Sequence, residues 1–327
     1  TILTDDEIIM STRKTIPTPA QPSKPSPDNL SPLKAIEPPN TNPNQPTPQG
    51  TPPLKELVKQ YDSVSLLLQG GGALGAYQAG IYEGLHKQGI KIDRISGISI
   101  GALNTAIIAG NRPENRLAAL QGFWNTITHR NYTPAGLNIY RQTANELDKL
   151  SKIDMVSHFM PWIFENGFLK QQLRVMESTA EAWQTMIEGQ RGFFKPRYFV
   201  PYDTTPNHLS YYTTDKLRET LERYCDLKLV NDVNRMKVSV SAVNVRNGNF
   251  AIFSNENEEL HYDHFIASGA LPPGFPAVEI DGEYYWDGGL VSNTPLNEIL
   301  SHEEHLKQLI FQVDLWNAKG TVPENMI

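Results

Sequence analysis

The segment SVSLLLQGGGALGAYQAGIYEGL, residues 63–85, sets the pattern for the whole fold. Its first seven residues, 63–69, are mostly apolar and are followed by glycines, which predicts a short buried strand. Apolar residues then recur at helical spacing, so a helix is expected after the glycines, ending near Gly89. The inner face of this helix is expected to carry Leu74, Tyr77, Ile81 and Leu85.

The same strand–turn–helix pattern recurs directly afterwards. DRISGIS predicts a strand at about 94–98, and IGALNTAIIAG predicts a small-residue helix that stops near Gly110. Two such units in fifty residues indicate a parallel sheet. More strands are expected in MKVSVSAVNV, NFAIFS and LKQLIFQVDLW, and a hairpin around Asp281-Gly282. The predicted fold class is α/β, with a mostly parallel central sheet flanked by helices.

The N-terminal part of the chain differs sharply in composition. Of 24 prolines, 13 fall within residues 1–60, among Ser, Thr, Asn and Gln. Such a segment cannot bury enough apolar surface to offset its chain entropy. We therefore predict a disordered Pro-rich tail over 1–58, with a possible protein partner at a PxxP site, and one compact domain over 59–327. Because the chain stops just after an expected strand, its C-terminal end is expected to be truncated.

Charge and cysteine content exclude several classes of protein. The net charge of −7 argues against nucleic acid as a partner and against recruitment to membranes by bulk charge. The single cysteine, Cys225, excludes an internal disulfide and a cysteine-based zinc site, and we expect it to be a core residue. No signal peptide is visible, which favours a cytoplasmic protein, with secretion left open.

The glycine loop allows two interpretations. Gly70, Gly72 and Gly75 spell G-x-G-x-x-G after a predicted strand, the spacing of a dinucleotide-binding turn. That site also needs an acidic residue at the carboxyl end of the next strand, where it binds the ribose hydroxyls. Asp93 lies before the next strand, at its wrong end. The nucleotide interpretation therefore lacks its second feature.

What stands at the carboxyl end of that strand is GISIG, residues 97–101. G-x-S-x-G is the pattern of a nucleophile elbow, in which a serine sits on a strained turn between a strand and a helix. Gly97 and Gly101 would remove side chains that collide in such a turn, leaving the hydroxyl of Ser99 exposed. Acyl transfer also needs backbone N–H donors for an oxyanion. The glycine loop and the N–H of Ile100 could supply them.

A third candidate is the aspartate of WDGG. Asp287 stands between a predicted hairpin strand and the glycines Gly288 and Gly289, on a loop that can approach another strand end. An Asp-Gly pair is also a common turn former, and Asp281-Gly282 is best read in that way. The residues by themselves do not decide between a catalytic and a turn-forming role for Asp287.

These motifs together resemble the patatin-like phospholipases. The resemblance rests on GGGALGAYQAG, GISIG and DGG in this order, covers roughly residues 63–315, and includes the approach ASGALPPGFPAVEIDGEYYWDGG. SYYTTDKLRETLERYCDLKLVND resembles a bacterial subgroup of the family with a C-terminal extension. Leu74 is a departure, because many members carry Arg or Lys there, a cation that could bind a phosphate head group or brace the loop.

The resemblance implies a metal-independent lipid acyl hydrolase of the phospholipase A or lysophospholipase type, with a lipid substrate at a membrane surface and no cofactor. It implies a dyad in which Ser99 is the nucleophile and Asp287 the general base. Gly70, Gly71 and Gly72 would line the oxyanion hole together with Ile100.

Other interpretations remain open. A conventional esterase orders its triad Ser, Asp, His, and His302 and His305 follow Asp287 in SHEEHLK. His261 and His264 have an H-x-x-H spacing but no clear third metal ligand. The aromatic segments 158–164 and 192–199 could line an acyl channel or form a lid, although core packing explains them as well. A catalytically silent member of the family, acting as a lipid-binding or scaffold module, is the last alternative.

Overall fold

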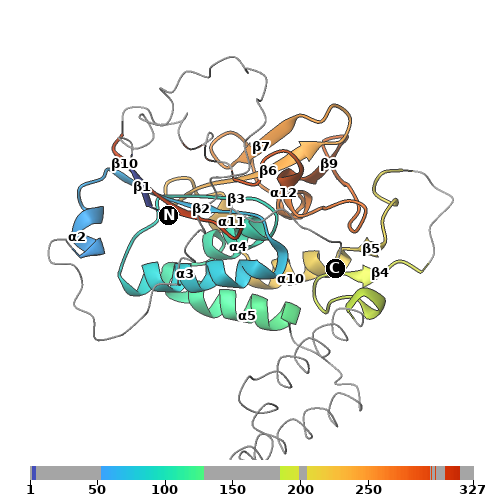
Figure 1. Cartoon of the computed structure of the whole chain (residues 1–327), viewed down its shortest axis with the longest axis horizontal. Helices are drawn as coiled ribbons and strands as arrows, with labels where there is room; N and C mark the ends of the chain where they lie inside the picture. The colour runs from blue at the N-terminus through green and yellow to red at the C-terminus, as the bar shows by residue number, and fades with distance from the viewer. Residues whose placement is uncertain are drawn as a thin grey trace, which may run out of the picture.

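The computed structural model describes residues 2–4, 53–128, 185–198, 205–294, 296, 299 and 306–316. The chain forms a central sheet with helices packed against it (Figure 1). The middle of the sheet is parallel, which confirms the predicted α/β class. In spatial order its four parallel strands are β10 (Gln308–Val313), β2 (Ser63–Leu68), β3 (Arg94–Gly97) and β6 (Lys237–Asn244).

The edges of the sheet are antiparallel. β1 (Ile2–Thr4) pairs with β10 at one edge. Two strands pair with β6, namely β7 (Phe250–Ser254) and β9 (Glu283–Asp287), and β8 (Val278–Ile280) pairs with β9. The sheet is thus mixed, with a parallel centre.

The predicted hairpin joins β8 and β9. Its two turn residues, Asp281 (φ 52°) and Gly282 (φ 79°), both have positive φ. Positive φ at both central positions is the requirement of a two-residue type I′ turn. This turn sends β9 back toward the centre of the sheet, so that its last residue is Asp287.

Helices cover one face of the sheet. α4 (Ile100–Ala109) contacts β2, β3 and β6 directly, and it packs against α3 (Gly75–Lys87), α5 (Arg116–Thr128) and α10 (Asp215–Tyr224). Figure 1 shows α3 and α5 lying side by side along this face. α4 is buried along its whole length, because the sheet lies on one side of it and helices on the others. The shorter helices are α2 (Leu54–Val58), α11 (Leu227–Val230) and α12 (Tyr262–Ser268).

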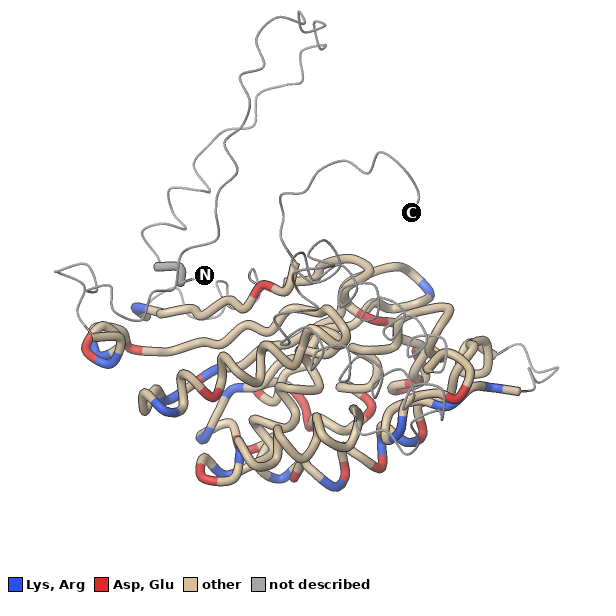
Figure 2. The backbone as a smooth tube through the Cα atoms, turned by 60° about the horizontal axis from the view of Figure 1, so that its bottom comes forward, with Lys and Arg blue, Asp and Glu red and all other residues tan. Residues whose placement is uncertain are grey.

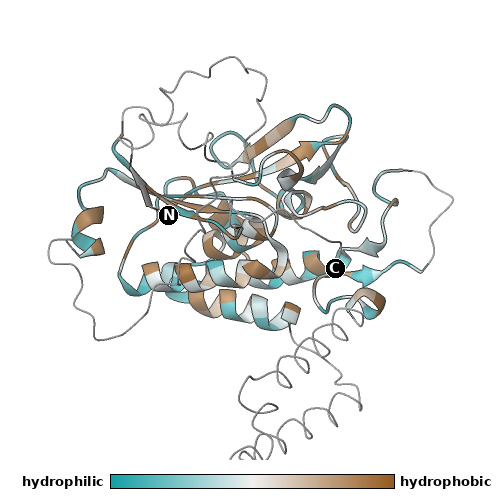
Figure 3. Cartoon of the chain, viewed as in Figure 1, coloured by the Kyte–Doolittle hydropathy of each residue, from teal (hydrophilic) through white to brown (hydrophobic). Residues whose placement is uncertain are grey.

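The core follows from the alternation of side chains along the strands. On β2, Leu66 and Leu68 point into the main core under the helices, whereas Leu67 joins Ile310 and Ile299 in a small cluster. Successive residues of a strand face opposite sides, so β2 is buried on both. The helices carry both apolar and polar residues (Figure 3), and the Lys, Arg, Asp and Glu residues lie mainly on helices and loops (Figure 2). Cys225 is 4% exposed and belongs to this core, as predicted.

One predicted face is wrong in part: Leu85 is buried and Ile81 packs against the core, but Leu74 and Tyr77 do not. On α3 the buried residues are Gly75, Gln78, Tyr82 and Leu85, while Leu74 and Tyr77 are 44% and 61% exposed. The predicted face lies one position along the helix from the observed buried face. The apolar pattern could not show this, because Gln78 on the buried face is polar. Its amide donates to the carbonyl of Gln69 (2.6 Å), which satisfies it inside the core.

Two short elements fall within the segment predicted to be a tail. β1 pairs with β10, and α2 packs Leu54 and Val58 against the core, so the last residues of 1–58 belong to the compact domain. The rest of the tail lies outside the described residues, where disorder and a PxxP partner stay predictions. No helix in the described ranges is long and apolar enough to cross a bilayer.

Candidate active site

Ser99 occupies the turn between β3 and α4. β3 ends at Gly97 and α4 begins at Ile100, so two residues reverse the chain. The backbone of Ser99 has φ 56° and ψ −125°. A non-glycine residue rarely adopts positive φ, and such strain gathers at functional sites. This is the local geometry that the G-x-S-x-G spacing predicts.

The two glycines of this turn are required by close packing. A Cβ at Gly101 would overlap the carbonyl oxygen of Leu68, and a Cβ at Gly97 would overlap the backbone of Gly101. Any larger residue would therefore push α4 away from the ends of β2 and β3. The turn can be this tight only because both positions lack a side chain.

The register of the sheet brings Asp287 to Ser99. β7 pairs with residues 239–243 of β6 and so occupies one side of that strand. β3 and β9 must both lie on the other side, where Gly97 pairs with Val240 and Asp287 pairs with Ala242. β3 and β9 run in opposite directions, so their carboxyl ends meet almost head to head beside β6. Ser99 and Asp287 extend from these two ends.

The Asp287 carboxylate is buried and hydrogen-bonded. The residue is 3% exposed, and its Oδ1 accepts a hydrogen bond from the N–H of Gly289 (2.8 Å). Burial raises the pKa of Asp287 above its usual range, while hydrogen bonds from the Ser99 side chain and the Gly289 N–H lower it in part. Position 288 must also be a glycine, because a Cβ there would meet the backbone of Ser241.

Ser268, which sequence reasoning missed, fills the gap between the two strand ends. It is the last residue of α12 and is fully buried. Its Oγ accepts a hydrogen bond from the N–H of Ser99 (3.0 Å) and donates one to the carbonyl of Ser241 (2.7 Å). Ser268 thereby ties the strained turn to β6. Nothing in IASGALPPG marks it, because its role depends on the register of β6.

The glycine loop lies against the nucleophile. A Cβ on Gly70 would be 3.1 Å from the Cβ of Ser99, and a Cβ on Gly71 would meet Leu315. Gly72, with φ 55°, begins a short 3₁₀ turn, η1 (Gly72–Leu74), that leads into α3. Gly70 and Ser99 are 29 residues apart in the sequence. The glycine loop and the turn that carries Ser99 therefore form one surface.

Three backbone N–H groups at this surface have no hydrogen-bond partner among the described residues: those of Gly71, Gly72 and Ile100. The N–H of Gly70, in contrast, donates to the Oδ1 of Asn293 (3.1 Å). Open donors at these positions are expected, because the first N–H groups of a helix have no carbonyl to bind within it. Gly72 begins η1 and Ile100 begins α4.

The alternative site residues that the structure describes lie elsewhere. Asp93 accepts a hydrogen bond from the N–H of Val64 (3.1 Å) near the start of β2, at the opposite end of the sheet from the glycine loop. His264 accepts from the N–H of His261 (2.8 Å) and caps α12. In the described parts of the chain no cluster of three potential metal ligands occurs, and no histidine hydrogen-bonds to Ser99 or Asp287. His302 and His305 lie outside the described residues.

The second aromatic segment is described in part. Phe193 and Phe194 make ring contacts with Phe275, and Phe194 also contacts Tyr212. Phe194 precedes β4 (Lys195–Pro196), and Tyr212 begins β5 (Tyr212–Thr213), which form a small separate sheet. This packing accounts for these aromatic residues. The first segment, 158–164, lies outside the described residues.

A strained serine between a parallel strand and a helix, beside a buried carboxylate and open N–H groups, is an arrangement that can support acyl transfer. The sequence matches the model of the patatin-like phospholipases over residues 66–300. The chain therefore belongs to the patatin-like phospholipase family, a family of carboxylic ester hydrolases.

Individual relatives match the chain over a short stretch or at low identity. It is 53% identical over 47 residues to a lysophospholipase, nte1, of Aspergillus terreus, a match that covers 14% of this chain and 3% of that protein. VipD from Legionella pneumophila covers 76% of this chain at 18% identity, and this chain spans 49% of it (TM-score 0.38). A chain of the complex of SpcU with ExoU from Pseudomonas aeruginosa covers 65% of this chain at 17% identity, and this chain spans 39% of it (TM-score 0.27).

Proposed function

We propose that this protein hydrolyses acyl esters of lipids, as a phospholipase A or lysophospholipase, through a Ser99–Asp287 dyad and an acyl-enzyme. The observation that carries the proposal is the meeting of β3 and β9 beside β6, which sets a strained serine against a buried carboxylate. The family supplies the class of substrate.

The first half of the reaction uses both members of the dyad. The Asp287 carboxylate takes the proton from Ser99 Oγ as that oxygen attacks the ester carbonyl. The raised pKa of Asp287 makes it a stronger base than an ordinary aspartate, provided that it is ionised. The protonated Asp287 then gives the proton to the departing alcohol oxygen. An acyl group remains on Ser99, and a water activated by Asp287 releases the fatty acid.

The negative charge of the tetrahedral intermediate needs donors that are already in place. We assign this role to the N–H groups of Gly71, Gly72 and Ile100, which have no other partner among the described residues. Gly70 lines the same loop, but its N–H is engaged by Asn293. Preorganised donors of this kind contribute about 10²–10³-fold to the rate for each hydrogen bond.

The test is release of fatty acid from mixed micelles of phosphatidylcholine and lysophosphatidylcholine. Wild-type protein should release fatty acid, while Ser99→Ala and Asp287→Asn should each lower the rate by at least about 10³-fold. Sedimentation with vesicles of the same lipids serves as the binding control. Binding without turnover in the wild type would contradict the proposal and favour a lipid-binding module.

A further inference from the structure

We infer that Asn293 is a positioning residue that holds the glycine loop at a fixed distance from the Asp287 loop. This inference rests on the proposed function, because it names the residue that sets the geometry of the same site. No sequence motif identified above includes Asn293, which lies in SNTP, six residues after Asp287.

The side-chain amide of Asn293 forms a reciprocal pair with the peptide groups of Gly70. Its Oδ1 accepts from the Gly70 N–H (3.1 Å), and its Nδ2 donates to the Gly70 carbonyl (3.0 Å). The indole N–H of Trp316 donates to the same carbonyl (3.1 Å). The N–H and both lone pairs of the carbonyl at Gly70 are thus engaged, which fixes the loop immediately before its open donors.

The backbone of Asn293 belongs to the segment that follows Asp287, the proposed general base. Val291 and Ser292 both donate their N–H groups to the Gly288 carbonyl, so Asn293 leaves the same tight turn that begins at Asp287. A Cβ placed on Gly289 would be 3.1 Å from the Asn293 Oδ1 and 3.1 Å from the Asp287 Oδ1. Gly289 lies between these two oxygens, so the amide and the carboxylate share one small volume.

A second layer of polar contacts supports the start of the loop. Gln69 donates from Nε2 to Thr294 Oγ1 (3.1 Å), and its Oε1 accepts from the N–H of Leu315 (2.7 Å). Its carbonyl accepts from the buried amide of Gln78 (2.6 Å). Residues that follow β2, β9 and β10 therefore converge on Gln69 and Gly70. Asn293 alone among these side chains binds both peptide groups of a loop glycine.

The kinetic consequence follows from the position of the Asn293–Gly70 hydrogen bonds. Negative charge on the oxyanion develops only toward the transition state. Loss of the Asn293–Gly70 hydrogen bonds should therefore misplace the N–H donors at that stage and leave substrate binding little changed. Asn293→Ala should lower kcat for p-nitrophenyl butyrate by about 10- to 100-fold with KM changed by less than about threefold. Asn293→Asp keeps the volume but sets a carboxylate against the Gly70 carbonyl, so its kcat should fall as well.

Asn231 provides a matched control. Its amide makes the same reciprocal pair with Leu260, accepting from the Leu260 N–H (2.8 Å) and donating to the Leu260 carbonyl (2.9 Å), at α11 and away from the site. Asn231→Ala should lower the melting temperature at unchanged kcat. A purely structural role for Asn293 would give the same result as Asn231, whereas a positioning role gives a loss of kcat in folded protein.

Hydrogen–deuterium exchange makes the inference independent of activity. In Asn293→Ala and Asn293→Asp the peptide that covers residues 69–75 should exchange faster than in wild type and in Asn231→Ala. Unchanged exchange of this peptide, or a wild-type kcat in Asn293→Asp, would overturn the inference. If the wild-type protein hydrolysed no ester, the proposed function would fail, and the exchange experiment would still decide whether Asn293 holds the loop.

Discussion

Burial of the Asp287 carboxylate has two opposite effects. It removes the charge from water, which makes the carboxylate a better base and also makes the folded state less favourable. Among the described residues, hydrogen bonds from Ser99 and Gly289 offset part of this cost of burial, and no cation is paired with the carboxylate. At the scale of one residue, activity and stability therefore depend on the same carboxylate in opposite senses.

The pH dependence of activity should show this burial. In the proposed mechanism Asp287 must be ionised to accept the proton of Ser99, so kcat/KM should fall as pH drops through the pKa of Asp287. Because burial raises that pKa, the midpoint of the acid limb should lie above the usual range of an aspartate. A pH profile of p-nitrophenyl butyrate hydrolysis measures it. An acid limb at or below the usual range would contradict the assignment of Asp287 as a buried base.

Replacement of the charge should stabilise the fold while it removes activity. The folded-state pKa is raised, so ionised Asp287 lowers the free energy of unfolding at pH values above that pKa. This penalty is absent below the pKa of the unfolded chain. Asp287→Asn should therefore melt at a higher temperature than wild type at pH 7–8 and lose that advantage toward acid pH. Thermal unfolding across pH checks the prediction, and a lower melting temperature at pH 8 would contradict it.

At the scale of elements, the strand–turn–helix units were predictable because their signals are local. The short apolar run of β2, the glycines around Ser99 and the small residues of α4 each indicate their structure from neighbouring residues. The meeting of β3 and β9 was not predictable, because it depends on which residue of β6 each strand pairs with. For the same reason Ser268 and Asn293 could not be found, although each touches a predicted site residue.

The close contact between α4 and β2 predicts a large difference between two glycines. Gly101→Ala should lower the free energy of unfolding by about 1–3 kcal/mol or more and abolish activity, because the new Cβ overlaps Leu68. Gly80→Ala is the control, since Gly80 lies on α3 with open space at its Cβ position. It should raise stability by about 0.5–1 kcal/mol at unchanged activity. Chemical denaturation of both variants measures the difference, and equal stability would contradict the packing of the elbow.

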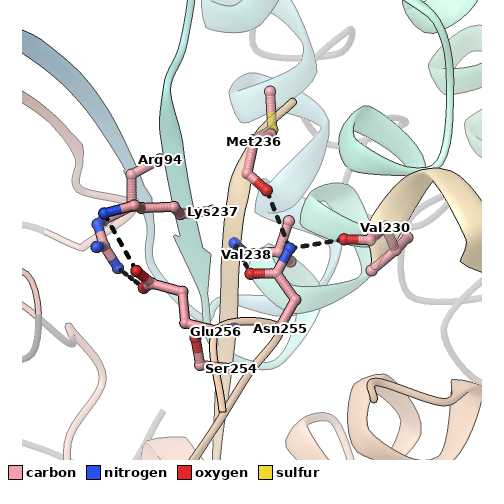
Figure 4. A network of polar contacts seen from close by, with 8 residues as sticks. All are labelled: Arg94, Val230, Met236, Lys237, Val238, Ser254, Asn255 and Glu256. Carbon is pink, nitrogen blue, oxygen red and sulfur yellow. Dashed lines mark hydrogen bonds and ion pairs between the residues drawn. The ribbon is translucent and has the colours of Figure 1, made fainter. Parts of the chain in front are cut away.

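At the scale of the whole molecule, the two ends of the sheet have different roles. The candidate site lies at the carboxyl ends of the parallel strands. At the amino ends, Figure 4 shows Arg94 of β3, Lys237 of β6 and Glu256 after β7 joined by ion pairs. Arg94 and Lys237 are paired in register, and Glu256 binds both (2.7 and 3.1 Å). Asn255 adds hydrogen bonds to Val238 and to two carbonyls nearby.

This network should make the fold sensitive to acid. Burial alone would raise the pKa of Glu256, but Arg94 and Lys237 bring it below its usual range. The stabilisation is therefore present above the unfolded-state pKa and is lost as pH falls through the lower folded-state pKa. Arg94→Met should reduce the free energy of unfolding by about 1.5–3 kcal/mol at pH 7, since Lys237 still pairs with Glu256, with a smaller loss near pH 3. Denaturation at both pH values measures it.

An exposed ion pair gives the comparison for this network. Lys59 and Glu56 are 2.8 Å apart but mostly exposed, so Lys59→Met should change stability by less than about 1 kcal/mol at either pH. Equal effects of Arg94→Met and Lys59→Met would contradict a role of the buried network in holding the amino ends of β3 and β6 to the carboxyl end of β7.

We propose that Ser99 is a nucleophile activated by Asp287 without a histidine. The most direct measurement is labelling with a fluorophosphonate probe, with the modified residue found by mass spectrometry. Wild type and the double variant His302→Ala/His305→Ala should be labelled at Ser99 at similar rates, Asp287→Asn should be labelled at least about 10²-fold more slowly, and Ser99→Ala not at all. Loss of labelling in the histidine variant, or labelling of Asp287→Asn at the wild-type rate, would contradict the dyad.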